Sequence, residues 1–236
     1  MSAEQAKSFQ RAAEAYERGR PGWPPELLDL LPVADDATVL DLAAGTGKLT
    51  RVLAARYAHV IAVEPLAELR AILSERVPKA EALQGVAEAI PLDEASVDAV
   101  FTGQAFHWFA NATALAEIVR VLRPDGVFAR LWNESAEPTP LPPEYLRRLE
   151  ELHEAMPPPD IDEHVFDGTP FGEVHEGMVE HELVASRDEV LAFAASVSWI
   201  ANRDDRDELL AELASLLPEG EYRFLMQANY EWSQRT

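Results

Sequence analysis

The stretch from Val39 to Thr50, VLDLAAGTGKLT, constrains the fold of this chain more than any other feature. An apolar run ends at Asp41, small residues follow, and Leu49 and Leu53 then recur at helical spacing. This order predicts a strand, a tight turn and a helix. In an open α/β sheet, such a turn lies at the carboxyl end of a strand, where ligands bind. Glycine at such a turn allows positive φ and a close approach to a ligand.

Two phosphate-binding motifs fit this turn incompletely. A P-loop requires Gly-x-x-x-x-Gly-Lys-Ser/Thr. Leu42 stands at its first glycine and Leu49 at its hydroxyl position, which excludes that motif. A dinucleotide fingerprint would use Gly45, Gly47 and Thr50, and it calls for Gly or Ala at the last of these positions. An NAD(P)-dependent oxidoreductase on a Rossmann fold therefore stays open as the alternative.

A third pattern fits better. The segment Asp41-Leu-Ala43-Ala-Gly45-Thr-Gly47 resembles motif I, Asp/Glu-x-Gly-x-Gly-x-Gly, of the class I S-adenosylmethionine-dependent methyltransferases. The resemblance is to the small-molecule, type 11-like members, and it departs from the motif only at Ala43. It implies that Asp41, Ala43, Gly45 and Gly47 form part of the binding site for S-adenosylmethionine, the methyl donor.

A carboxylate closes the next apolar run. His59–Val63 is followed by Glu64 and Pro65. A carboxylate about 20 residues beyond a glycine-rich turn can accept hydrogen bonds from ribose hydroxyls. In the family that Asp41–Gly47 resembles, the acidic residue at this position binds the adenosyl ribose, and Glu64 matches it. We expect Pro65 at the start of the following helix, where its missing N–H would have no partner in any case.

The segment Gln84–Val100 resembles the family's Gly-Asp-Ala-Glu-x-Leu-Pro-Phe…Ser-Phe-Asp-x-Val segment. In the family this loop packs on the adenine ring, and its Asp takes the exocyclic amine. Val86 stands at that Asp position in this chain. The resemblance therefore implies an adenine contact from the backbone of Val86 and Ala87, or from Glu88.

Aromatic residues follow the predicted fourth strand, in Gly103–Phe109. The resemblance implies that this segment, including Gln104, faces the donor and the acceptor. Phe106 and Trp108 would wall an apolar pocket and contact the sulfonium. His107 would take a proton from an acceptor hydroxyl or amine, since imidazole titrates near neutrality. The alternative is that these residues are packed core, and a carboxylate acceptor would need no base.

The N-terminal segment Ala12–Pro25 resembles the family's Tyr-Glu-x-x-Arg-Pro-x-Tyr-Pro segment. In this interpretation Tyr16 or Arg20 binds the methionine carboxylate, because an arginine fork suits a carboxylate. The alternative is a solvated cap helix and linker. We expect one methyltransferase domain over 1–236, with a cap segment at 1–31 and an acceptor-site cover at about 134–172.

The rest of the chain fits an α/β fold with a Rossmann-like, doubly wound sheet. The resemblance implies seven strands in the order 3-2-1-4-5-7-6, with strand 7 antiparallel. The Arg-Pro-Asp-Gly sequence at 123–126 predicts a turn with Gly126 in the strained position. Further expected elements are strands at 98–102, 127–132, 173–184 and 222–232, an amphipathic helix through 115–122, and helices at 145–156, from Ser186 to Ser198, and after Asp205.

Composition limits the partners of this chain. The net charge of −22 repels phosphate backbones, so we expect no nucleic acid acceptor. The chain has no cysteine, and therefore no disulfide or thiol nucleophile. We expect no membrane span, because no apolar run reaches about 18 residues. The N-terminus lacks an apolar signal core, and we expect a cytoplasmic protein. The histidine spacings contain no His-Glu-x-x-His, and we expect no metal site.

The leading hypothesis is an S-adenosylmethionine-dependent methyltransferase that acts on a small-molecule acceptor by in-line methyl transfer. The donor is intrinsically reactive, so catalysis would come largely from proximity and orientation. The alternatives are the NAD(P)-dependent oxidoreductase and a non-catalytic S-adenosylmethionine-binding module. The sequence leaves open the acceptor, the choice among O-, N- and C-methylation, and the oligomeric state.

Overall fold

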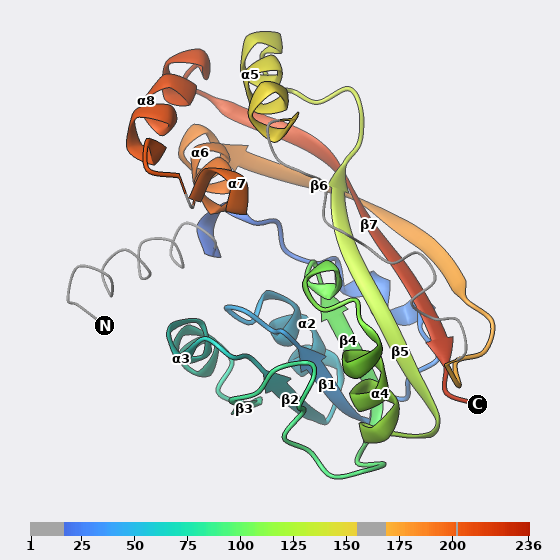
Figure 1. Cartoon of the computed structure of the whole chain (residues 1–236). Helices are drawn as coiled ribbons and strands as arrows, with labels where there is room; N and C mark the ends of the chain where they lie inside the picture. Colours follow the sequence, from blue (N-terminus) through green and yellow to red (C-terminus); the bar gives the residue numbers. More distant parts are fainter. Residues whose placement is uncertain (1–16, 155–168, 202) are drawn as a thin grey trace. The chain divides into compact units, whose positions relative to one another are not determined.

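The computed structural model describes residues 17–154, 169–201 and 203–236, and a seven-stranded sheet is its central feature (Figure 1). The strands are β1 (Thr38–Leu42), β2 (His59–Val63), β3 (Glu81–Leu83), β4 (Val97–Gly103), β5 (Leu122–Ser135), β6 (His175–Ser186) and β7 (Glu221–Gln234). They lie in the order β3-β2-β1-β4-β5-β7-β6, and β7 is antiparallel. The predicted α/β fold, strand order and antiparallel strand are therefore confirmed.

Strand β1 pairs in parallel with β2 and with β4. Strand β2 pairs in parallel with β3, and β4 with β5. Leu40 at the centre of β1 lies opposite Ile61 of β2 and Val100 of β4. Thr102 of β4 lies opposite Arg130 of β5. Because parallel strands end at the same edge of a sheet, the segments that follow β1, β2 and β4 gather at one edge.

The chain forms two compact units. One contains the described residues within 1–21, 135–158 and 180–226. The other contains the described residues within 22–134, 159–179 and 227–236, and so holds β1 to β4 and nearly all of β5. The single domain with a cap at 1–31 and a cover at about 134–172 stays a prediction, because parts of both segments lie outside the described residues.

In the second unit, the connections between strands form helices. They are η1 (Pro25–Leu30), α2 (Lys48–Arg56), α3 (Ala67–Arg76), η2 (Phe106–Trp108) and α4 (Ala112–Val121). The predicted amphipathic helix is α4, which buries Leu115 and Ile118 at a helical spacing of three. The side chain of Asn111 caps it by accepting a hydrogen bond from the amide of Ala114 at 3.0 Å.

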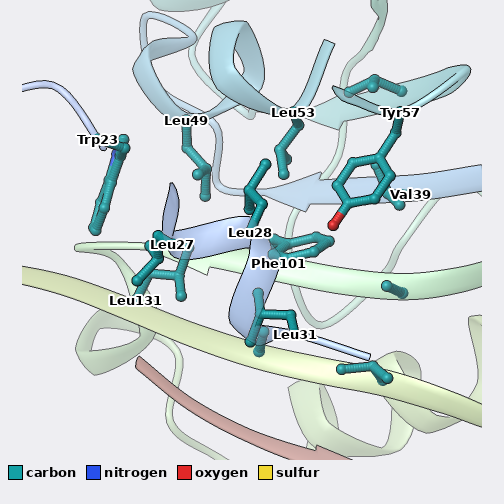
Figure 2. Packing of buried hydrophobic residues seen from close by; sticks show 14 of the residues in the cluster. Trp23, Leu27, Leu28, Leu31, Val39, Leu49, Leu53, Tyr57, Phe101 and Leu131 are labelled. Atoms are coloured by element: carbon teal, nitrogen blue, oxygen red, sulfur yellow. The ribbon is translucent and has the colours of Figure 1, made fainter. Parts of the chain in front are cut away.

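Alternation along the strands divides the apolar residues of this unit between two cores. Val39 belongs to one cluster and its neighbour Leu40 to another, because successive strand residues point to opposite faces. In the first cluster, Leu28 of η1 lies close to Leu53 and Phe101 (Figure 2). The short helix η1 therefore anchors the segment before β1 on one face of the sheet.

The first unit, which includes residues within 135–158 and 180–226, contains α5 (Pro143–Glu154), α6 (Arg187–Ser196), α7 (Ser198–Ala201) and α8 (Arg206–Leu216). The predicted capping box is confirmed, since Ser186 and Glu189 exchange side chain to backbone hydrogen bonds at the start of α6. Leu209 and Leu213 of α8 are buried in the core of this unit.

Two local predictions are wrong. The positive φ in the segment 123–126 belongs to Asp125, at 63°, and this segment is already part of β5. Gly126 is instead required by space, because a Cβ there would lie 2.8 Å from the carbonyl oxygen of Arg123. Pro65 does not start the helix after β2, because α3 begins at Ala67 with Leu66 as its N-cap.

Two further features concern surfaces. None of the helices within the described residues is long and apolar enough to cross a membrane. Strand β6 lies at the end of the sheet, and its residues alternate between exposed and partly buried.

Candidate functional site

The turn between β1 and α2 has an unusual backbone. Ala43, Gly45 and Gly47 all have positive φ, at 59°, 58° and 86°. A Cβ placed on Gly45 would have no atom within 4 Å, whereas one on Gly47 would lie 2.9 Å from Cγ of Leu73. Gly47 is therefore required for packing against α3, and Gly45 faces open space at the carboxyl edge of the sheet.

Glu64 joins this turn to the end of β2. Its Oε2 accepts a hydrogen bond from the amide of Gly45, and its Oε1 accepts one from the amide of Leu66, each at 2.9 Å. The residue is buried, and burial raises the pKa of its carboxyl, against the effect of these two hydrogen bonds. Glu64, which is predicted to bind the donor ribose, therefore contacts the glycine turn directly, and its bond to a ribose stays a prediction.

Asp41 lies beneath the same turn. Its side chain is buried, and Oδ2 accepts a hydrogen bond from the hydroxyl of Thr50 at 2.6 Å. Its other oxygen, Oδ1, makes no hydrogen bond to the part of the chain that the structure describes. Burial raises the pKa of Asp41 to about 7, although the hydrogen bonds from Thr50 act in the opposite direction. Asp41 thus ties the end of β1 to the first turn of α2.

The predicted adenine-binding loop follows β3. The backbone of Val86 pairs with that of Ala89 in an isolated antiparallel bridge, and the side chain of Val86 is exposed while Ala87 is buried. Glu88 accepts a hydrogen bond from Nδ2 of Asn111 at 3.0 Å. The N-cap residue of α4 therefore also holds the acidic residue of this loop.

Gln104 begins the segment that follows β4. It has a positive φ of 57°, and its Nε2 donates a hydrogen bond to the carbonyl oxygen of Asn133 at 2.8 Å. The amide of Gln104 also donates to the carbonyl oxygen of Leu131 at 2.9 Å. Gln104 is therefore fixed against β5 at the same sheet edge as the glycine turn.

The aromatic residues of η2 differ in their exposure. Phe106 is buried, with its ring centroid 5.6 Å from those of both Phe109 and Phe128. Trp108 is 69% exposed, and the ring of His107 lies 4.9 Å from it. The structure therefore brings Trp108 and His107 to the surface and holds Phe106 in the core.

The two N-terminal candidates lie elsewhere. Tyr16 is outside the described residues. Arg20 belongs to the other compact unit, where its Nε donates to Oγ of Ser196 at 3.1 Å and its guanidinium lies over the ring of Phe193. Its binding of the methionine carboxylate stays a prediction. No group of three or more histidine, cysteine or acidic residues suited to a metal ion is found across 17–154, 169–201 and 203–236.

Sequence reasoning missed three side chains near this edge. Asn111 donates a hydrogen bond to Glu88. The sequence could have indicated Asn111 as a helix N-cap, because it precedes an apolar run. Arg130 forms an ion pair with Glu231. The only signal for this pair was a lone charge inside an otherwise apolar strand, since its partner lies far away in the sequence.

Known proteins match this region. A family model described as a methyltransferase domain matches residues 40–129. The match begins in β1 and ends in β5, so it includes the glycine turn, Glu64 and the segment after β4. Residues 40–129 are therefore similar to a methyltransferase domain, in agreement with the class I S-adenosylmethionine-dependent methyltransferases that the glycine turn resembles. Methyltransferases of this family use S-adenosylmethionine as the methyl donor.

Curated relatives match about half of this chain. It is 51% identical over 130 residues to an uncharacterized methyltransferase of Mycobacterium tuberculosis, which covers 55% of this chain and 54% of the relative. It is 36% identical over 107 residues to a trans-aconitate 2-methyltransferase of Azoarcus sp., which covers 44% and 42%. The chain thus spans about half the length of the curated relatives it matches.

A solved structure extends the similarity of the methyltransferase fold. A candidate type II methyltransferase from Anaeromyxobacter dehalogenans is similar with a TM-score of 0.68 at 27% identity. The match covers 91% of this chain and 97% of the other. The strands after the family match therefore also follow a known methyltransferase arrangement.

Proposed function

We propose that this protein transfers a methyl group from S-adenosylmethionine to a small-molecule acceptor. The observation that carries the proposal is the contact between Glu64 and the amide of Gly45 at the carboxyl edge of the sheet. Through this contact the buried carboxylate of Glu64 lies beside the glycine turn, and the space next to Gly45 is empty. Ribose hydroxyls and a close backbone approach need this combination.

The residues at this edge fit the donor. Because Gly45 has no side chain, the space next to it stays open and the donor could lie against the backbone of the turn. A Cβ on any other residue would occupy part of that space. Glu64 would accept hydrogen bonds from the ribose, and the backbone of Val86 and Ala87, or Glu88, would contact the adenine. Asp41 would hold the turn in shape from below through its bond to Thr50. Further residues that we place around the donor are Ala43, Gly47, Pro65 and Gln104.

When bound, S-adenosylmethionine supplies an activated methyl group on a sulfonium for in-line displacement. The exposed ring of Trp108 is suited to face that cation or an apolar part of the acceptor. Phe106 supports this segment from the core. His107, next to Trp108, would accept a proton from an acceptor whose reactive atom carries one.

A small acceptor is supported by charge and by similarity. The net charge of −22 opposes binding of a nucleic acid backbone. The Azoarcus relative is named for trans-aconitate, a small organic acid. Acceptor size is thus part of the proposal, and it is tested separately from donor binding.

Calorimetric titration with S-adenosylhomocysteine tests the donor site. Gly45→Val should abolish detectable binding, because its side chain enters the open space at the turn. Gly220→Val is the matched control, since Gly220 also has a positive φ and open surroundings but precedes β7. His107→Ala should leave the donor affinity unchanged. Wild-type affinity in the Gly45 variant would contradict the proposed site.

Product analysis separates the proposed enzyme from a non-catalytic binding module. The protein is incubated with labelled S-adenosylmethionine and a panel of small organic acids, amines and phenols. Donor binding together with a methylated product supports the enzyme. Donor binding without any methylated product, in the panel and in a metabolite extract, favours the module, and stabilisation by NAD or NADP instead of the donor favours the oxidoreductase.

A further inference from the structure

One ion pair lies near the carboxyl end of β4 and has no role in the proposed donor site. Arg130 of β5 and Glu231 of β7 form it across two neighbouring strands. Phe128 and Arg130 are two residues apart on β5, so they share a face of the sheet, and Phe128 packs with Phe106 in its core. The ion pair therefore lies on the face that carries η2.

The register places Arg130 next to the functional edge. Arg130 lies opposite Thr102, and the next pair joins Leu131 to Gly103, the last residue of β4. Gln104 then bonds to Asn133 on the same strand. Arg130 is therefore separated from the carboxyl end of β4 by a single residue.

The guanidinium is partly dehydrated but accessible. It lies over the ring of Phe106, 5.0 Å from its centroid. The side chains of Arg130 and Glu231 are each 23% exposed, and burial lowers the pKa of Arg130 to about 10. In such surroundings a guanidinium interacts more strongly with a carboxylate than it would in water.

A small cavity opens at this pair. Its walls are Phe128 and Arg130 from β5, Val174, and Glu231, Trp232 and Ser233 from β7. The cavity is only about 10 Å³, which is room for about one water molecule, so an anion could reach Arg130 only if Glu231 moved aside. A partly buried ion pair is also weak evidence for a purely stabilising role, because the cost of desolvation offsets much of the attraction.

We propose that Arg130 recognises the acceptor, that the acceptor carries a carboxylate, and that Glu231 competes with this carboxylate for the guanidinium. The inference rests on the proposed function. Arg130 would hold the acceptor carboxylate through parallel N–H donors, beside the ring of Phe106. Glu231 would occupy the same cation in the absence of acceptor, and would so disfavour weakly charged molecules.

The two halves of the pair should respond in opposite directions. Arg130→Gln should weaken carboxylate binding about 10- to 100-fold, the range for lost hydrogen bonds to a charged group. Glu231→Gln should strengthen it several-fold, because the internal competitor is neutralised. Arg123→Gln is the matched control, since Arg123 pairs with Asp98 at the opposite end of β5 and should leave binding unchanged.

The experiment measures thermal stabilisation of the full chain, loaded with S-adenosylhomocysteine, by trans-aconitate, succinate and acetate and by their methyl esters. We expect the acids to stabilise the wild type and the esters not to. Stabilisation by the acids should be smaller in Arg130→Gln and larger in Glu231→Gln. Equal changes in both variants, or no stabilisation by any acid while the donor analogue is bound, would overturn this inference alone. Failure of the donor analogue to bind would instead overturn the proposed function.

Discussion

The amide of Gly45 donates a hydrogen bond to Oε2 of Glu64, so the turn after β1 is tied directly to the end of β2. The second oxygen of Glu64 accepts from the amide of Leu66, immediately before α3. One carboxylate thus satisfies amides on both sides of the proposed donor site, and it does so without a ligand.

Glu64→Gln should destabilise the protein by about 1–3 kcal/mol and weaken donor binding. A carboxamide keeps one acceptor oxygen but turns an NH₂ group toward the other amide, which leaves buried donors unpaired. Urea unfolding and calorimetry with S-adenosylhomocysteine check the two effects. Glu75→Gln, on the exposed surface of α3, should change stability by no more than about 0.5 kcal/mol. Wild-type stability in the Glu64 variant would show that these hydrogen bonds contribute little.

Asp41 should make stability depend on pH. Burial raises its pKa from 3.8 to about 7, so between these values the folded chain keeps a proton that the unfolded chain releases. The free energy of unfolding should therefore fall as pH rises through this window, by up to about 1.4 kcal/mol per pH unit. Asp41→Asn keeps an acceptor for Thr50 but cannot ionise, and urea unfolding at several pH values should show a shallower fall. An unchanged slope would argue against a protonated Asp41, and substitution of the exposed Asp36 serves as the control.

Ala43→Gly should stabilise the protein by about 0.5 kcal/mol. The left-handed conformation at Ala43 costs an L-residue roughly 1–2 kcal/mol, and glycine avoids this cost. Glycine also gives the unfolded chain more conformational freedom, which cancels part of this stabilisation. Ala71→Gly, in the exposed middle of α3, should instead cost about 1 kcal/mol. Thermal unfolding of the two variants should thus show shifts of opposite sign, and a matching loss in both would refute the assigned strain.

Asn111 allows helix capping and loop fixation to be separated. Asn111→Asp keeps an acceptor for the amide of Ala114 but loses the donor to Glu88 and adds a like charge, so donor affinity should fall with little loss of stability. Asn111→Ala loses both contacts and should also cost about 1 kcal/mol of stability. Calorimetry and urea unfolding together distinguish these outcomes. If the aspartate variant binds the donor normally, Glu88 does not contribute to the site through this contact.

The sequence predicted the elements whose evidence is local. An apolar run, small residues and an amphipathic run predicted β1, the turn and α2, because each depends on residues a few positions apart. The position of Glu64 was predictable for the same reason. The seven-strand order came from resemblance to a family, since the pairing of β5 with β7 joins segments far apart in the chain.

Local sequence failed where a contact from elsewhere decides the conformation. Near Gly126, space rather than φ requires the glycine, because the carbonyl of Arg123 and the backbone of Asp98 lie close to it. The burial of Phe106 depends on Phe128 in the neighbouring strand. The pairing of Arg130 with Glu231 was likewise beyond any pattern of neighbouring residues.

The position of β6 at the end of the sheet has a consequence for how separate molecules meet. An end strand offers unpaired backbone groups to which another chain can add its own strand, and this is a common route to aggregates. Glutamates at 176, 180 and 182 recur along β6 at every second or fourth residue. Two copies that met along this margin would bring like charges together, which opposes their pairing even though Glu182 also forms an ion pair with Arg223.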